Sequence, residues 1–251
     1  MTVYFIGAGP GAVDLITVRG QRLLQRCPVC LYAGSIMRDD VLQFCPPGAR
    51  IVDTGPLTLD SIVAEFQQAH AAGLDVARLH SGDPSLYSAV AEQSRRLGEL
   101  GIDYEIVPGV TAFAAAAAAL GRELTVPGIA QTVTLTRVAT LSTAMPPGED
   151  LAALAGTGGT LVIHLAAHRI ESVVNELLAA GHRPDTPVGV VAFASWPQEV
   201  VLRGTLADIA DQMKQYEITR TAVIIVGDAL AARGFADSYL YSAGRTRGDR
   251  H

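Results

Sequence analysis

Short apolar runs alternate with amphipathic segments through the first half of the chain. Four short runs predict strands, at residues 3–6, 29–32, 76–79 and 104–107, and the run at 76–79 has the composition of a buried strand. Apolar positions three or four residues apart predict helices over 14–26, 58–72 and 85–100. Strands that alternate with helices in this way predict a mainly parallel sheet with helices on both faces.

The second half of the chain repeats the alternation less regularly. Five further runs predict strands, at residues 132–136, 160–165, 188–193, 200–203 and 222–226. A helical pattern covers 170–180 and ends at Gly181, and an alanine-rich helix is expected over 111–120. The break at Pro127 and Gly128 indicates a domain boundary, so we expect an N-terminal α/β domain over 1–126 and a C-terminal α/β domain over 127–251.

Composition narrows the class of protein. With 251 residues, 49% of them hydrophobic, the chain can bury one large core or two smaller ones. No apolar run approaches the roughly 20 residues that a membrane helix needs, and the chain enters a strand at once without a basic leader. We therefore expect a cytoplasmic protein that does not bind membranes. The net charge of −6 argues against nucleic acid as a partner.

The cysteines and histidines predict no metal site. Cys27 and Cys30 have the spacing of a redox pair or half a zinc site, but no second pair follows. They span a predicted helix-to-strand junction, so we interpret them as small buried residues in a reducing compartment, with a redox role as the weaker alternative. His164 and His168 are four residues apart, but His164 lies in a predicted strand, which argues against a helical metal pair.

A glycine-rich loop at residues 7–12 (GAGPGA) joins the first strand to the first helix. With Ala12 in the third position it fits the loose dinucleotide-binding pattern, which makes a nicotinamide-dependent reductase the alternative from a different functional class. However, Pro10 removes an N–H group that would face a pyrophosphate. No acidic residue ends the second strand, where one would bind the ribose.

Two further motifs follow predicted strands. In segment 80–87 (HSGDPSLY), Gly82 lets the backbone approach a ligand, and the Asp83 carboxylate can accept hydrogen bonds from hydroxyl groups or an amine. An ordinary strand-to-helix turn explains this segment alone equally well. Segment 107–112 (VPGVTA) is the third motif. In open α/β sheets, ligands bind at the carboxyl ends of strands, where all three motifs are expected.

In their order and spacing, these three segments closely resemble the tetrapyrrole methylases, S-adenosylmethionine-dependent enzymes that methylate porphyrinoid and corrinoid precursors. The resemblance implies an α/β fold of class III methyltransferase type, with two α/β domains and a cofactor cleft between them, in a homodimer. It implies S-adenosyl-L-methionine as cofactor and S-adenosyl-L-homocysteine as product. The implied cofactor-binding residues are Pro10, Ser81, Gly82, Asp83, Leu86, Thr111, Ala112, Leu165, Ala194 and Ala222. Members of the family usually carry Asp where Ala12 stands.

Segments 31–35, 120–124 and 131–137 resemble the branch of this family that methylates C11 of precorrin-4 in cobalamin biosynthesis. The cobalt-precorrin-4 branch shares them, so cobalt in the substrate stays open, and methylation of another carbon is a further alternative. The substrate carries several carboxylates, which Arg38, Arg122 and Arg137 are hypothesised to bind. Solvated surface arginine is an equal alternative for each. No catalytic base is evident, and His80 is interpreted as a satisfied strand histidine.

Overall fold

The structure is a computed structural model, and it describes residues 1–139 and 144–237. The chain divides into two compact units, of which the first comprises Met1–Ala115 and Phe193–Gln198. The second unit comprises Ala116–Ala192 and Glu199–His251. The expected domain boundary between residues 126 and 127 stays a prediction.

The first unit is built on a five-stranded sheet in the order β3-β2-β4-β1-β5. Every neighbouring pair in it is parallel, as the alternating pattern predicted. The strands are β1 (Thr2–Gly7), β2 (Val29–Tyr32), β3 (Arg50–Asp53), β4 (Val76–His80) and β5 (Asp103–Val107).

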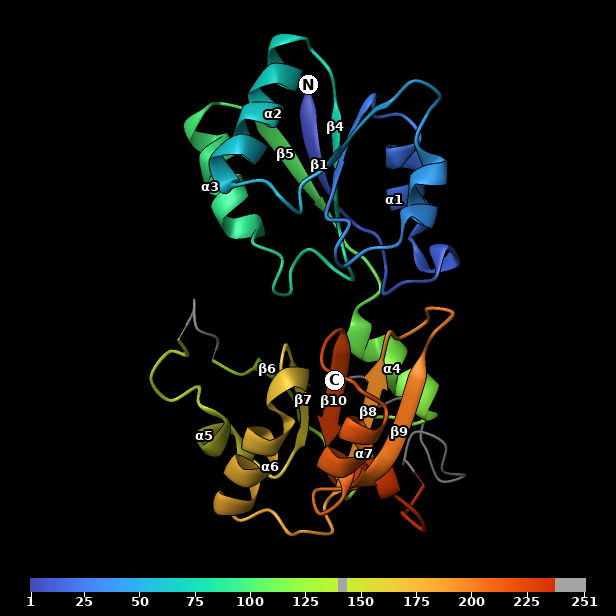
Figure 1. Cartoon of the computed structure of the whole chain (residues 1–251), viewed down its shortest axis with the longest axis vertical. Coiled ribbons are helices and arrows are strands. Elements are labelled where there is room, and N and C mark those ends of the chain that lie inside the picture. Colours follow the sequence, from blue (N-terminus) through green and yellow to red (C-terminus); the bar gives the residue numbers. More distant parts are fainter. Residues whose placement is uncertain (140–143, 238–251) are drawn as a thin grey trace, which may run out of the picture. The chain divides into compact units, whose positions relative to one another are not determined.

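Helices cover both faces of this sheet (Figure 1). They are α1 (Val18–Leu24), α2 (Leu59–Ala71) and α3 (Val90–Glu99), and α4 (Ala112–Leu120) begins in this unit. Successive side chains of β1 point to opposite faces of the sheet. The Phe5 ring meets the Phe66 ring of α2 edge to face, with the ring centroids 6.4 Å apart, whereas Ile6 packs in the same cluster as Leu24 of α1. Short 3-10 helices occur at Val13–Leu15 and Asp39–Phe44.

The structure corrects three local predictions in the first unit. The helix expected from residue 14 begins at Val18, because the Thr17 side chain accepts a hydrogen bond from Gly20 N and caps it there. The helix expected from residue 85 begins at Val90, because Tyr87 and Ala89 have left-handed backbone conformations. Strand β3 was missed, since its four residues are only half-buried or exposed and give no apolar run.

The second unit contains a mixed sheet in the order β6-β7-β10-β8-β9. All five predicted strands are present: β6 (Val133–Arg137), β7 (Thr160–His164), β8 (Pro187–Ala192), β9 (Val200–Thr205) and β10 (Ala222–Val226). Only β6 and β7 pair in parallel, and the other pairs are antiparallel.

Helices accompany this sheet within the described part of the second unit. The helix predicted over 170–180 is α6 (Ile170–Ala179), while α5 (Leu151–Ala155) and α7 (Ile209–Gln215) were not predicted. The end of α4 packs on this sheet so closely that a Cβ on Gly189 would lie 2.6 Å from Leu120 Cδ1. Among the described residues, no helix combines the length and the apolar character needed to cross a bilayer.

Candidate functional site

The chain leaves β1 and β4, two neighbouring strands, in opposite directions. After β1 it crosses to β2 on one side, and after β4 it crosses to β5 on the other. At such a switch point, ligands bind in the crevice beyond the carboxyl ends of the two strands. The order β3-β2-β4-β1-β5 also differs from the 3-2-1-4-5-6 order of dinucleotide-binding sheets.

The three sequence motifs meet at this switch point through their glycines. Gly9 and Gly82 form an isolated bridge, with Gly9 N donating to Gly82 O at 3.2 Å and Gly82 N donating to Gly9 O at 2.7 Å. A Cβ on Gly7 would lie 2.6 Å from Gly109 Cα, and a Cβ on Gly109 would lie 2.2 Å from Gly82 O. Only residues without side chains permit this approach, so the glycines of the three motifs form one backbone junction.

The Asp83 carboxylate ties two of the motifs together. Its Oδ2 accepts a hydrogen bond from Gly109 N at 2.7 Å, and its Oδ1 accepts from Ser85 N at 2.8 Å and from the Ser85 hydroxyl. Burial acts to raise the pKa of Asp83, but the hydrogen bonds from Ser85 and Gly109 outweigh it and lower the pKa. Asp83 is therefore ionised and holds the two motifs together. Its direct contact with a ligand remains a prediction.

Two ionisable side chains lie buried on β4 beneath this junction. The Arg78 guanidinium donates to Thr54 Oγ1 at 3.0 Å and to Gln93 Oε1 at 3.2 Å, and burial lowers its pKa to about 10. Burial, followed by the neighbouring Arg78 charge, lowers the pKa of His80 to about 3. His80 is thus neutral, and within the described residues its Nε2 has no hydrogen-bond partner, so the expected satisfied histidine is wrong at that atom.

The other predicted cofactor residues of the first unit lie in the segments that follow β1, β4 and β5. Pro10 is buried in the glycine-rich loop, and Ser81 is half-buried directly after β4. Thr111 and Ala112 stand at the start of α4. Leu86 is half-buried in an irregular loop and not in the helix that was expected over 85–100, which begins at Val90.

The remaining predicted cofactor residues lie on or beside β8, β7 and β10. Ala194 is buried in the segment Phe193–Gln198, which directly follows β8 and belongs to the first unit. Leu165 follows β7 and is 54% exposed with φ 55°. Ala222 begins β10, which runs antiparallel to β7. The end of β7 therefore lies beside the start of β10, and Leu165 and Ala222 are at the same end of these two strands. Their role in cofactor binding remains a prediction.

The three arginines proposed to bind substrate occupy different elements. Arg38 belongs to the first unit and forms an ion pair with Asp40. Arg122 is exposed just after α4 in the second unit. Arg137 ends β6 in the second unit and donates hydrogen bonds to Val138 O at 3.1 Å and Ala144 O at 3.3 Å. Each unit therefore contains at least one of the three.

Sequence reasoning missed two residues that contact the glycine-rich loop. Ser195 Oγ accepts a hydrogen bond from Ala12 N at 2.9 Å, and Trp196 Nε1 donates to Pro10 O at 2.8 Å. The available signal was composition, because Trp196 is the single tryptophan of the chain. Nearly two hundred residues separate the partners in sequence, and no local pattern connects them.

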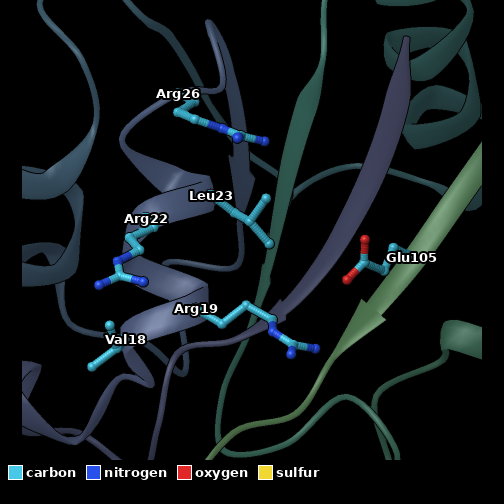
Figure 2. A pocket seen from close by; sticks show the side chains of 6 residues that line it. All are labelled: Val18, Arg19, Arg22, Leu23, Arg26 and Glu105. Carbon is cyan, nitrogen blue, oxygen red and sulfur yellow. The ribbon is translucent and has the colours of Figure 1, made fainter.

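A surface pocket of about 500 Å³ lies elsewhere in the first unit, between α1 and the edge strand β5. Figure 2 shows the side chains that line it, which are Val18, Arg19, Arg22, Leu23, Arg26 and Glu105. It includes none of the predicted site residues. The functional site is therefore assigned from the motif junction and not from this pocket.

The cysteines agree with the structural interpretation. Cys27 and Cys30 are buried in the core on the α1 side, and all three cysteines are free thiols. Burial, together with the nearby Asp75 charge, raises the pKa of Cys27 to about 12. A thiol protonated at neutral pH is a poor nucleophile, which disfavours the redox alternative.

The sequence profile of the Tetrapyrrole (Corrin/Porphyrin) Methylases matches residues 2–210, a span that includes all three motifs of the junction. The chain belongs to the tetrapyrrole methylases. This membership confirms the resemblance of the three motifs, and it excludes the nicotinamide-dependent reductase as the interpretation of the glycine-rich loop.

Known members of the tetrapyrrole methylases are similar over nearly the whole chain. A precorrin-4 C(11)-methyltransferase of Mycobacterium tuberculosis is 76% identical over 245 residues, which is 98% of each chain. The solved structure of a cobalt precorrin-4 methyltransferase is 42% identical, with a TM-score of 0.88 over 91% of this chain and 95% of that one. A uroporphyrin-III C-methyltransferase from Thermus thermophilus, solved with S-adenosyl homocysteine, is 30% identical, with a TM-score of 0.77 over 92% and 99%.

Proposed function

We propose that this tetrapyrrole methylase transfers a methyl group from S-adenosyl-L-methionine to C11 of precorrin-4 in cobalamin biosynthesis. The observation that carries this proposal is the 76% identity over 98% of both chains to a precorrin-4 C(11)-methyltransferase. The cobalt precorrin-4 methyltransferase of known structure is 42% identical, which favours the metal-free substrate over the cobalt form.

The residues at the motif junction fit the cofactor. A Cβ on Gly82 would lie 3.6 Å from Ala112 N, an ordinary contact distance, so the Gly82 Cα faces the beginning of α4. The first turn of α4 holds no acidic residue, and its N–H groups have no acceptor within the helix. Such a helix terminus favours a carboxylate, and S-adenosylmethionine carries one on its amino-acid end.

The proposed cofactor residues divide between polar and apolar functions. Ser81, Gly82, Asp83, Thr111 and Ala112 are proposed to bind the amino-acid end, through hydroxyl and backbone groups beside the junction. Pro10, Leu86, Leu165, Ala194 and Ala222 are proposed to border the rest of the cofactor with apolar or small surfaces. No side chain in this set is a strong base, in keeping with a reaction that needs alignment above all.

When bound, the cofactor would supply an electrophilic methyl group on its sulfonium. The C11–methyl bond would form in line as the methyl–sulfur bond breaks, with S-adenosyl-L-homocysteine as the leaving group and a proton released from the macrocycle. The chain contributes orientation and exclusion of water. The glycine junction fixes the backbone that approaches the cofactor, and Asp83 makes that junction rigid by joining two motifs. Arg38, Arg122 and Arg137 are proposed to bind carboxylates of the macrocycle.

Three further properties belong to the proposal. The protein is proposed to act as a homodimer, as the family resemblance implies, and to work in the cytoplasm. Its domains are proposed to span 1–126 and 127–251. Sedimentation equilibrium across a range of protein concentrations tests the dimer, which a monomer at micromolar concentration would overturn.

The deciding experiment is product analysis with methyl-labelled S-adenosylmethionine. Metal-free precorrin-4 and its cobalt form are offered in parallel, and NMR locates the methylated carbon. Label at C11 of the metal-free substrate is the expected result. Label only with cobalt present would assign the protein to the cobalt-dependent branch, and label at another carbon would overturn the assignment of position.

A further inference from the structure

The segment Phe193–Gln198 has an unusual backbone for its composition. Phe193 and Ser195 both adopt left-handed conformations, with φ 52° and 64°. Residues other than glycine rarely adopt such backbone conformations, and these conformations persist where surrounding contacts hold them. Here the turn is closed by Trp196 N, which donates to Phe193 O at 2.8 Å. The turn directs two consecutive side chains, Ser195 and Trp196, at the same loop.

That target is the glycine-rich loop at residues 7–12. Trp196 Nε1 donates to Pro10 O at 2.8 Å, and Ser195 Oγ accepts from Ala12 N at 2.9 Å. Between these two bonds the indole lies so close to Gly11 that a Cβ there would fall 2.0 Å from Trp196 Cδ1. Three consecutive loop residues are therefore fixed by two consecutive side chains.

The ring of the same indole also contacts the guanidinium group of Arg38. The Arg38 guanidinium carbon lies 5.9 Å from the centroid of the Trp196 ring, within the range of a cation–π contact. Two guanidinium nitrogens, Nε and Nη2, donate to Asp40 Oδ2. Across residues 1–139 and 144–237, the other N–H groups of Arg38 have no protein acceptor, and the side chain is 24% exposed. Arg38 is thus oriented by its partners while it keeps donors for a further carboxylate.

We infer that Trp196 is a positioning residue for the methyl transfer: it holds the glycine-rich loop with its N–H group and directs Arg38 toward a carboxylate of the tetrapyrrole with its ring face. The inference rests on the proposed function for the identity of the ligand, a polycarboxylate tetrapyrrole. A side chain that only filled space would need neither the hydrogen bond to Pro10 nor the cation above its ring. These two contacts can be weakened separately.

Fluorinated tryptophan weakens the ring contact alone. Because the chain contains one tryptophan, growth on 5-fluorotryptophan or 5,6-difluorotryptophan, whose fluorines are remote from the N–H group, alters only residue 196. Fluorine withdraws electron density from the ring face and leaves the N–H donor in place. We expect the KM for the tetrapyrrole to rise stepwise, by about threefold in total, with an unchanged KM for S-adenosylmethionine.

Trp196→Phe weakens the loop contact, because it removes the N–H donor and keeps an aromatic face. We expect about a fivefold loss in kcat/KM, with rises in the KM of both substrates, because the glycine-rich loop serves the whole junction. Tyr216→Phe is the matched control, since Tyr216 is an exposed aromatic residue of the second unit, and it should change neither value. Melting temperatures of all forms separate a general loss of stability from these effects.

A binding arm keeps this test independent of the proposed substrate. If the wild type transfers no methyl group to precorrin-4, the proposed function fails, and uroporphyrin, a stable polycarboxylate tetrapyrrole, replaces it as ligand. The affinity for uroporphyrin is then measured for every form by titration of the uroporphyrin absorbance, and Arg38→Gln should lower it about fivefold. Equal tetrapyrrole binding by wild-type, fluorinated and Arg38→Gln protein, or losses that follow melting temperature alone, would overturn the positioning role.

Discussion

The two sheets of the molecule present predicted site residues in different ways. In the first unit, loops diverge from neighbouring parallel strands, and the predicted residues surround a junction of Gly7, Gly82 and Gly109. In the second unit, Leu165 and Ala222 lie at the ends of two inner strands of a mixed sheet. Leu165 is 54% exposed and Ala222 is half-buried. A backbone junction admits very few residue types, whereas an apolar strand end admits many.

This difference explains why the three glycine motifs that identify the family lie in the first unit. A Cβ placed at Gly109 would meet backbone atoms, which cannot rotate away as a side chain does. Leu165 meets solvent on much of its surface, so an apolar side chain of similar volume can replace it at small cost. Substitutions should therefore affect the first unit strongly and the second unit weakly.

Gly109→Ala should give the largest effect. Its Cβ would lie 2.2 Å from Gly82 O, so the junction must open. We expect a loss of more than about a hundredfold in kcat/KM and about 3 kcal/mol in the free energy of unfolding. Urea unfolding followed by Trp196 emission measures the first unit, which contains the only tryptophan.

Gly98→Ala is the matched control for that substitution. Gly98 lies within α3 with no atom within 4 Å of an added Cβ, so alanine should stabilise the helix by about 0.5–1 kcal/mol. Equal losses in the two variants would contradict the importance of the junction.

Asp83→Asn should give the next largest effect. The amide keeps the shape of the side chain but brings an NH₂ group toward Gly109 N or Ser85 N, both of which are donors. We expect a loss of about 2 kcal/mol in stability and between about ten- and a hundredfold in kcat/KM. Asp60→Asn, at an exposed surface ion pair with Arg96, should cost less than about 1 kcal/mol.

His80 should make the first unit sensitive to acid. Its folded pKa of about 3 lies below the ordinary value of 6.5, so the unfolded chain takes up a proton first as the pH falls. The stability that neutral His80 provides is complete above pH 6.5 and is lost progressively toward pH 3. Between pH 7.5 and pH 4.5, wild type should lose about 1–2 kcal/mol more than His80→Leu, as measured by urea unfolding. Equal pH slopes would contradict this prediction.

Leu165→Met should give the smallest effect. Both side chains are apolar and similar in volume, so we expect less than about a threefold change in the KM for S-adenosylmethionine and less than about 1 kcal/mol in stability. A tenfold change would break the comparison between the units, because it would show that these strand ends of the second sheet are as demanding as the glycine junction.

The sequence predicted most of the first unit because period and special residues agree there. The strands β1, β2 and β4 follow apolar runs, whereas β5 was found although only Val107 is buried in it, and the glycine motifs mark the ends of β1, β4 and β5. Strand β3 escaped prediction because its half-exposed residues lack an apolar run. The start of α3 was misplaced because the left-handed conformations of Tyr87 and Ala89 follow from the surrounding loop and not from their own propensities.

The sequence by itself therefore determined which glycine motifs follow predicted strands, and only the structure showed that Gly7 and Gly109 pack against backbone while Gly98 does not. The sequence also determined the family and the three segments that carry the proposed cofactor site. Only the tertiary structure decided which residues support those segments. Trp196 reaches Pro10 across 186 positions, and the buried Arg78 finds Thr54 and Gln93 on separate elements. Such contacts depend on chain topology, which brings distant residues together without leaving a local pattern in the sequence.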